Sequence, residues 1–391
     1  MKNGKNTTSF QLENVDGKAR AGRLVTPRGC VDTPLFMPVA TQGSVKALDP
    51  HDLESAGAGL VLGNAYHLYL RPGVEIISEL GGLHRFMGWN GPILTDSGGF
   101  QGFSLKHLRE IDENGITFRS HIDGSTHVIT PETIIAVQEK LCSDIMMPLD
   151  VCLPHDADEK SVSEGILRTN RWIERCIRSR TNTSQMLFGI VQGGLFKDLR
   201  QQSVEFMNNL DMPGYSIGGL SVGESKSKMY EITSLTAGLL PEKKPRYLMG
   251  VGAPEDIVEC VARGIDMFDC VLPTRVARNG ALYTRDGRIN ITAAKFKNFD
   301  GPVDSGCHCY CCERFSAAYL NHLFKAREYL AYRLASIHNL SFIFQLMVEI
   351  RSSILEGEFE NYRNCFWSKY RVSDESVRTQ QRKKWGSSDR T

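Results

Sequence analysis

Pro92-Ile93-Leu94-Thr95-Asp96 is a short apolar run that stops at a charged residue, and runs of this form recur along the chain. They show little alternation of apolar and polar residues, which is typical of strands buried on both faces of a sheet. We therefore expect eight such strands, in the segments Leu35 to Ala40, Leu60 to Asn64, Pro92 to Asp96, Ile145 to Asp150, Leu187 to Gln192, Tyr215 to Gly219, Tyr247 to Gly250 and Met267 to Val271.

Helical patterns separate most of these runs. Thr130 and Pro131 have the residue types of an N-cap and a first helical position. A further helix is indicated by an apolar stripe at Val162, Ile166, Ile173 and Ile177. Strands that alternate with helices favour a parallel sheet, and eight units favour a closed (β/α)8 TIM barrel. A doubly wound open sheet is the alternative architecture.

Two stretches fall outside this alternation. Residues 9 to 34 are predicted to form an N-terminal antiparallel sheet. Residues 97 to 129 form a glycine-containing insertion with hairpin signals at Glu113-Asn114-Gly115 and Asp123-Gly124. An insertion of this length beside a strand end is a candidate lid.

Polar residues gather where the predicted strands end. A (β/α)8 barrel carries its active site at the carboxyl ends of the strands. Two aspartates there suit chemistry at a sugar carbon, one as nucleophile and the other as acid and base. The glycines after Asp96 also allow the backbone to approach a ligand closely. The residues at these ends are Asp96, Asp150, Gln192, Gly218, Gly219 and Asp269.

The segment from Cys307 to Cys312 is dense in thiols, and Cys307, Cys309 and Cys312 have the spacing C-x-C-x-x-C. With His338 they would complete a tetrahedral Zn²⁺ site, and a closed shell of four protein ligands indicates a structural ion. Other candidate ligands are Cys311, His308 and His322. His322 lies in the middle of a predicted helix, which favours His338.

The net charge of +1 hides an uneven distribution. Residues 275 to 333 hold ten Lys or Arg against five Asp or Glu, and a second basic cluster lies after residue 377. Basic segments on a nearly neutral protein suit a polyanion-binding face. The first ten residues lack the apolar core of a signal peptide, and no run is long enough to span a membrane. We therefore expect a cytoplasmic protein without disulfides.

Several longer motifs carry a family resemblance from about Phe10 to about Tyr370. They appear in the order NAYHL with RPG, TDSGGFQ, IVQGG, GGLSVGE, YLMGVG, DMFDCVLPTR with ARNG, and the cysteine cluster followed by IHN. Together they resemble the tRNA-guanine transglycosylases, and the bacterial branch in particular. The resemblance implies an irregular (β/α)8 barrel with a zinc-binding insert near its carboxyl end.

The resemblance also implies a role for each matching residue. Asp269 resembles the nucleophile that attacks the ribose, and Asp96 resembles the acid and base. The base pocket would take its edge contacts from Asp150, Gln192 and the Gly219 amide, its ring contacts from Phe100 and Met249, and its contacts to the substituent arm from Cys152, Leu220 and Val222. The tRNA contacts would be Arg275 and Arg278, and the zinc ligands Cys307, Cys309, Cys312 and His338. Gly102 and Ala65 depart from the residues usual in the family.

The implied reaction replaces the wobble guanine of tRNA with a deazaguanine base through a covalent ribosyl-aspartate. The expected incoming base is 7-aminomethyl-7-deazaguanine (preQ1), with queuine as the alternative, and the expected assembly is a homodimer. The expected domains are the barrel with its N-terminal sheet (1–295), a zinc-binding subdomain (296–345), a helix that closes the barrel (346–370), and a basic, disordered tail (371–391).

Two other classes of function compete with this interpretation. A non-catalytic tRNA-binding subunit would be expected to lack the catalytic aspartates, whereas this chain has both Asp96 and Asp269. A metal-dependent barrel hydrolase would need histidine ligands at the strand ends, and the predicted ends supply none.

Overall fold

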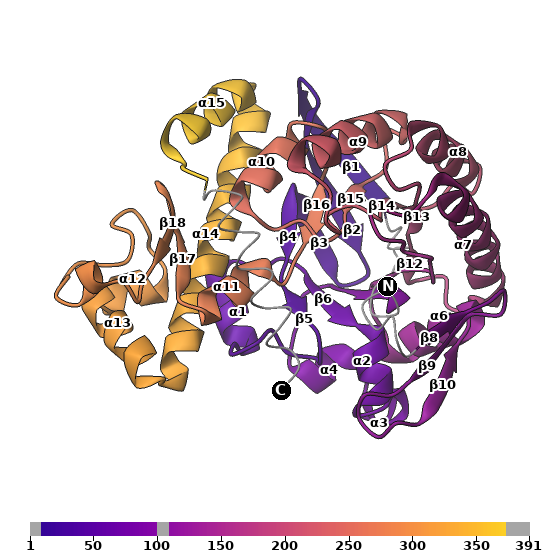
Figure 1. The fold of residues 1–391 in the computed structure, drawn as a ribbon, viewed down its shortest axis with the longest axis horizontal. Coiled ribbons are helices and arrows are strands. Elements are labelled where there is room, and N and C mark those ends of the chain that lie inside the picture. Colours follow the sequence, from indigo (N-terminus) through magenta and orange to yellow (C-terminus); the bar gives the residue numbers. More distant parts are fainter. Residues whose placement is uncertain (1–8, 100–108, 373–391) are drawn as a thin grey trace, which may run out of the picture.

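The computed structural model describes residues 9–99 and 109–372. The apolar runs form parallel strands, which lie at the centre of Figure 1. These strands are β4 (Leu35–Met37), β5 (Val39–Ala40), β6 (Val61–Asn64), β7 (Ile93–Asp96), β11 (Ile145–Met146), β12 (Met186–Leu187), β13 (Gly189–Val191), β14 (Tyr215–Ile217), β15 (Arg246–Leu248) and β16 (Met267–Asp269).

The strands pair in two five-stranded sheets. One has the order β12-β11-β7-β6-β5 and the other β13-β14-β15-β16-β4, and the neighbours in both are parallel. Only Pro38 separates β4 from β5, and only Phe188 separates β12 from β13. The first sheet follows the order of the chain. The second runs in chain order from β13 to β16 and then adds β4, the first of the parallel strands. Neither has the order reversal of a doubly wound sheet.

Side chains along each strand alternate between two apolar clusters, as the strand period of two requires. Leu62 and Leu94 belong to one cluster, which the strands share with Leu24 and Val31 of the N-terminal sheet. Val61 and Ile93, which precede them in the chain, belong instead to the apolar layer between the strands and the helices. Because both faces are apolar, the runs carry no polar alternation. Each buried side chain of this size contributes about 1.5–3 kcal/mol to folding.

The N-terminal segment forms the predicted antiparallel sheet. Its strands are β1 (Ser9–Asp16), β2 (Ala19–Thr26) and β3 (Gly29–Thr33), in that order. Leu24 and Val31 are buried on one face of this sheet and pack against the apolar ends of the parallel strands.

Helices follow most of the parallel strands, and several surround them in Figure 1. Thr130 caps one of these helices, as predicted, because its side chain accepts a hydrogen bond from the N–H of Thr133 at 3.2 Å. Of the predicted stripe, Ile177 is exposed while the other three residues are buried. The helices are α1 (Pro50–Ala56), α2 (Ala65–Leu70), α3 (Val74–Glu79), α4 (Leu83–Met87), α6 (Pro131–Leu141), α7 (Glu159–Ser179), α8 (Lys197–Asn208), α9 (Lys226–Leu239), α10 (Pro254–Val261) and α11 (Leu272–Arg278).

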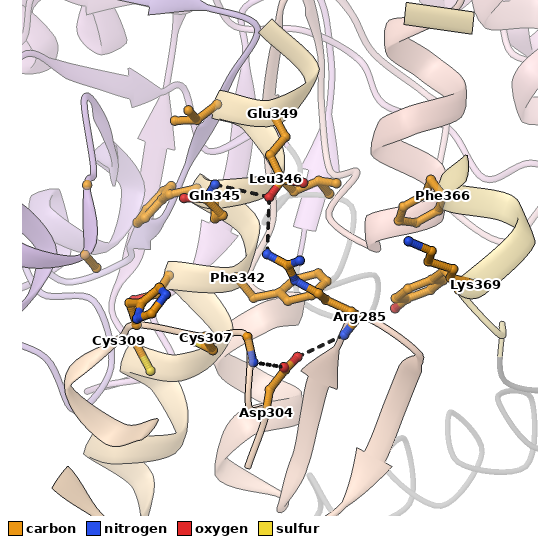
Figure 2. Close-up of a pocket in the computed structure, with 18 of the residues that line it drawn as sticks. Arg285, Asp304, Cys307, Cys309, Phe342, Gln345, Leu346, Glu349, Phe366 and Lys369 are labelled. Carbon is orange, nitrogen blue, oxygen red and sulfur yellow. Dashed lines mark hydrogen bonds and ion pairs between the residues drawn. The ribbon is translucent and has the colours of Figure 1, made fainter. Parts of the chain in front are cut away.

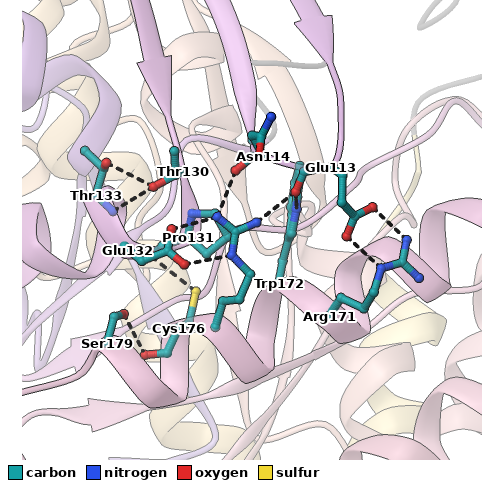
Figure 3. A network of polar contacts seen from close by, with 12 residues as sticks. Glu113, Asn114, Thr130, Pro131, Glu132, Thr133, Arg171, Trp172, Cys176 and Ser179 are labelled. Carbon is teal, nitrogen blue, oxygen red and sulfur yellow. Dashed lines mark hydrogen bonds and ion pairs between the residues drawn. The ribbon is translucent and has the colours of Figure 1, made fainter.

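The described part of the insertion forms a small antiparallel sheet, with strands β8 (Arg109–Ile111), β9 (Ile116–Arg119) and β10 (Thr126–Ile129). Its first turn is anchored to α7, as Figure 3 shows. Arg171 forms a bidentate pair with Glu113, at 2.7 and 2.8 Å. Arg175 donates to the carbonyl oxygens of Glu113 and Asn114 while also pairing with Glu132. These contacts hold this turn of the hairpin against α7. A lid that swings at this turn would have to break them.

The carboxyl-terminal elements lie to one side of the parallel strands in Figure 1. They are β17 (Ala281–Thr284), β18 (Gly287–Asn290), the 3-10 helix η1 (Ala294–Phe296), α12 (Tyr310–Arg314), α13 (Ala317–Ala326), α14 (Tyr329–Glu356) and α15 (Phe359–Lys369). The long α14 packs against α11, β17 and the N-terminal sheet, and it runs through the expected boundary between residues 345 and 346. Within residues 9–99 and 109–372, no helix combines the length and apolarity needed to cross a bilayer.

Candidate functional site

Asp96 is the last residue of β7, and its parallel register places it beside Asn64 at the end of β6. The amide Nδ2 of Asn64 donates to Oδ2 of Asp96 at 2.7 Å, and the N–H of Ala65 donates to Oδ1 at 3.3 Å. Ala65, which differs from the residue usual in the family, can still bond to Asp96, because this contact comes from its backbone N–H.

Asp269 ends β16 and accepts two hydrogen bonds on one oxygen. The hydroxyl of Tyr247 donates to Oδ1 at 2.6 Å, and the N–H of Gly250 donates to the same atom at 2.9 Å. Burial raises the pKa of Asp269, while these two donors stabilise its carboxylate and oppose that rise.

The two aspartates lie close enough to influence each other's ionisation. Burial raises the pKa of Asp96 to about 8, and the charge of Asp269 adds to that rise. The donors from Asn64, Ala65 and Gly98 oppose it but do not cancel it. A pair of this kind divides its roles, because one carboxyl holds a proton near neutral pH while the other stays ionised.

A second group of buried polar side chains follows two neighbouring strands. Asp150 lies four residues after the end of β11, because the strand expected from Ile145 to Asp150 stops at Met146, and Gln192 directly follows β13. Nε2 of Gln192 donates to Oδ2 of Asp150 at 2.6 Å, and both residues are buried. Burial raises the pKa of Asp150 to about 6, and the Gln192 donor opposes this. A methyl group added at Gly99 would lie 2.3 Å from Oδ1 of Asp150, so only glycine fits there. Gly99 therefore lies against Asp150, and the close approach to a ligand expected after Asp96 stays a prediction.

The loop after β14 completes this side of the site. Gly219 has a φ of +68°, and a methyl group there would lie 2.5 Å from Oε1 of Gln192. The carboxylate of Glu224 accepts hydrogen bonds from the N–H groups of Ser221 and Val222, which holds the loop in a turn. Leu220 is buried.

The structure places the other predicted residues as follows. Cys152 is buried, and Met249 is half-buried one residue after β15. Arg275 is exposed in the last turn of α11, where Arg278 is half-buried. Phe100 lies outside the described residues, as does Gly102.

Cys307, Cys309, Cys312 and His338 form one compact group that could hold a metal ion, with their ligand atoms all within 4.8 Å of one another. Nδ1 of His338 lies 3.3–3.7 Å from the three sulfur atoms. Its Nε2 lies 2.7 Å from the carbonyl oxygen of Tyr283 and can only donate to it, which leaves Nδ1 free to ligate. The other candidate ligands, Cys311, His308 and His322, are not part of the group.

A cavity of about 520 Å³ lies beside this cysteine group, between α14 and α15. In Figure 2 its wall carries cations at Arg285 and Lys369 and carboxylates at Asp304 and Glu349. Asp304 accepts from the N–H of Arg285 at 3.0 Å, and Glu349 approaches the guanidinium at 3.7 Å. The charges balance locally, and none of the strand-end residues lines the cavity, so the candidate active site lies elsewhere.

Sequence reasoning assigned no role to Asn64, Tyr247 or Arg200. Asn64 ends an apolar run just as Asp96 does, so the same signal could have found it. Tyr247 lies in a predicted buried strand, where an aromatic residue is expected to be part of the hydrophobic core. Arg200 is fully buried in α8, and an arginine in a helical pattern gives no sign of that.

Comparison with known proteins places this geometry in a family. The model of the family described as queuine tRNA-ribosyltransferase matches residues 16–372. The queuine tRNA-ribosyltransferase of Dehalococcoides mccartyi strain 195 is 55% identical over 367 residues, covering 94% of each chain. That of Herpetosiphon aurantiacus is 52% identical over 95% of each chain. That of Solidesulfovibrio magneticus is 55% identical over 91% of this chain and 96% of its own.

The raised pKa of Asp96 predicts a pH-dependent difference in stability between the wild type and Asp96→Asn. A folded-state pKa of about 8, against an ordinary 3.8, means that the proton stabilises the fold at low pH. That contribution is lost as the pH rises from about 4 to about 8. The Asp96→Asn variant has no carboxyl group to ionise at this position and so does not lose this stability. Its free energy of unfolding should therefore rise relative to that of the wild type between pH 5 and pH 8, by at most about 1.4 kcal/mol per pH unit.

Urea denaturation at pH 5, 6.5 and 8 measures this difference. Asp156→Asn, at an exposed position, is the matched control and should show no such trend. A constant difference between Asp96→Asn and wild type over this range would show that Asp96 ionises at low pH like an exposed aspartate.

Proposed function

We propose a base-exchange reaction at the strand-end carboxylates of this chain, which belongs to the queuine tRNA-ribosyltransferase family. The chain is accordingly a tRNA-modifying enzyme of the glycosyltransferase class. One observation carries the detailed proposal: the charge of Asp269 raises the pKa of Asp96, and the two carboxyl groups have different hydrogen-bond donors. That asymmetry suits one nucleophile and one proton carrier.

In the first step, a carboxylate oxygen of Asp269 bonds to C1′ of the wobble guanosine as the bond from C1′ to N9 breaks. The electron pair stays on the guanine, and Asp96 supplies the proton that the departing base takes up. The donors from Tyr247 and Gly250 stabilise the carboxylate form of Asp269 and fix its orientation. The product is a ribosyl ester of Asp269, and the phosphate backbone of the tRNA stays intact.

In the second step, the incoming base attacks C1′ through N9 and gives its N9 proton to Asp96, while the ester bond to Asp269 breaks. Both side chains return to their starting states, so no redox cofactor is needed. Two displacements at C1′ retain the configuration of the sugar.

The base is proposed to bind beside Asp150. The buried carboxylate accepts from the donor edge of a guanine-type base, and Gln192 and the Gly219 N–H donate to its oxygen. Met249 packs on the ring, with Phe100 proposed on its other face. Cys152, Leu220 and Val222 are proposed to surround the substituent arm.

The tRNA is proposed to dock at α11 and the basic segment that follows it. Arg275 is exposed, and Nη1 of Arg278 has no hydrogen-bond partner within residues 9–99 and 109–372. A phosphate of the tRNA would accept a hydrogen bond from this nitrogen. The target guanosine would be turned out of its stack to reach the two aspartates. A cytoplasmic location, where tRNA is found, stays part of the proposal.

The two parallel sheets are inferred to close into one (β/α)8 barrel. The support is that β4 continues into β5 and β12 into β13, so each sheet starts where the other ends. The expected division at residues 295, 345 and 370 also stays a proposal, with α14 common to the second and third parts. A homodimer is proposed because Tyr310, Tyr319 and Tyr329 expose large aromatic surfaces.

Asp269→Asn is expected to abolish the covalent enzyme–tRNA adduct, because a neutral amide is a poor nucleophile at C1′. The measurement is a denaturing gel of enzyme incubated with unmodified tRNA, together with exchange of labelled guanine. Asp156→Asn serves as control and should form the adduct. An adduct that persists in Asp269→Asn would remove this residue as the nucleophile.

Zinc is the metal that we propose for the cysteine group, since three thiolates and one imidazole are donors that Zn²⁺ prefers. Elemental analysis of wild type should give about one zinc per chain, as expected for a single four-ligand site. Cys309→Ser should lose the metal and lower the melting temperature, because metal binding adds to folding free energy. The exposed Cys365→Ser is the control. Wild type that is active without metal would contradict the assignment.

The incoming base is predicted to be preQ1 rather than queuine. Val222 branches at its β-carbon and is stiff, and the Glu224 carboxylate holds its backbone, so it cannot easily make room for the cyclopentenediol of queuine. The Leu220 carbonyl can accept a hydrogen bond from the aminomethyl ammonium. Competition of the two bases against labelled guanine in tRNA decides between them. Preferential incorporation of queuine would contradict this choice while leaving the exchange chemistry intact.

A further inference from the structure

Arg200 is a fully buried cation directly behind the proposed base pocket. It lies in the first turns of α8. Its Nε donates to the carbonyl oxygen of Gly194 at 3.0 Å, and its Nη1 donates to that of Val191 at 3.1 Å. Nη2 has no hydrogen-bond partner in the part of the chain that the structure describes. Burying an unpaired charge costs several kcal/mol, so neutral carbonyl acceptors alone do not account for its presence.

The unpartnered nitrogen points toward the groups proposed to bind the base. A methyl group added at Gly219 would lie 3.6 Å from Nη2 of Arg200 and 2.5 Å from Oε1 of Gln192. Nη2 of Arg200 therefore lies beside Gly219, and the Gln192 amide lies beside the same glycine. A methyl group at Gly193 would lie 2.8 Å from the backbone nitrogen of Arg200, so a glycine is required for α8 to approach this closely.

The cation keeps its charge near neutral pH. Burial lowers the pKa of Arg200 to about 10, and Cys152 and Glu224 act in the opposite direction. A charge beside a pocket that is shielded from water acts strongly on a polar ligand atom, because the local dielectric constant is low. The field of Arg200 is positive on the side of the pocket that Gln192 and Gly219 form.

We propose that Arg200 is a positioning residue that makes the pocket select a purine with a 6-oxo group over one with a 6-amino group. Its positive field acts through the Gly219 peptide and the Gln192 amide. It favours an acceptor oxygen at position 6 of the purine and disfavours an amino group there. The same field stabilises the departing purine, whose negative charge spreads onto the 6-oxygen as the glycosidic bond breaks. The inference rests on the proposed function, because it takes Gln192 and Gly219 as contacts to the base.

The test compares how guanine and 2,6-diaminopurine compete with labelled guanine for incorporation into unmodified tRNA. The ratio of their inhibition constants does not depend on the fraction of active enzyme. Arg200→Gln should reduce the preference for guanine about tenfold, which is the scale of one charge-assisted contact, and should lower kcat more than it raises KM. Arg200→Lys retains a cation and should keep most of the preference.

Arg246→Lys is the matched control, since Arg246 is also buried but bonds to the carbonyl of Leu240 away from the strand ends. It should leave the ratio unchanged. An unaltered ratio in Arg200→Gln would overturn the proposal. If Arg200→Gln does not fold, Arg200→Met, which also lacks the charge, replaces it: a folded methionine variant that loses the preference supports the role of the charge, and one that keeps the wild-type ratio overturns that role. Failure of the wild type to exchange guanine would instead refute the proposed function itself.

Discussion

Two carboxylates that share one partly buried site impose the main constraint on this molecule. Burial opposes a negative charge on either Asp96 or Asp269, and each charge opposes the other. The protein resolves the conflict with donors: a tyrosine hydroxyl and a backbone N–H converge on one oxygen of Asp269. At Asp96 the donors do not cancel the effects of burial and of the Asp269 charge, and its pKa is raised to about 8. The proposed nucleophile and the proposed acid are thus distinguished by their surroundings, since the side chains are chemically identical.

The strand arrangement supplies those surroundings. Parallel pairing brings the carboxyl ends of the strands in each sheet to the same edge, and the register of β6 against β7 sets Asn64 beside Asp96. A shift of one residue would turn every side chain to the opposite face and dissolve the site. Apolar side chains on both faces of the strands secure this register, so the packing that stabilises the fold also positions the chemistry.

Glycines allow the polar groups to meet. Gly99 lets the backbone after Asp96 press against Asp150, and Gly219 lets its loop turn over Gln192. Any side chain at Gly99 would displace Asp150, and any side chain at Gly219 would displace Gln192. At Gly219 the positive φ excludes most other residues as well. In the cysteine group, a backbone contact also fixes a polar side chain, because the carbonyl oxygen of Tyr283 orients His338 toward the three thiols.

Local signals were enough to predict much of this from the sequence. The unalternating runs marked the strands, Thr130 marked a helix start, and the Glu113-Asn114-Gly115 signal marked a hairpin. The spacing of the cysteines, together with His338, predicted the group that the structure brings together. These features depend on a few neighbouring residues, or on donor types that chemistry strongly restricts, so a sequence displays them directly.

Tertiary structure alone decided the remainder. It turned Tyr247 toward Asp269, buried Arg200 beside Gly219, and anchored the insertion to α7 through Arg171 and Arg175. It also raised the pKa of Asp96 above that of an exposed aspartate. Each of these depends on residues far apart in the chain, and on how completely water is excluded between them. The sequence by itself determined which chemical groups are present and in what local structure. Their burial and mutual distance, which set their charge and reactivity, exist only once the chain has folded.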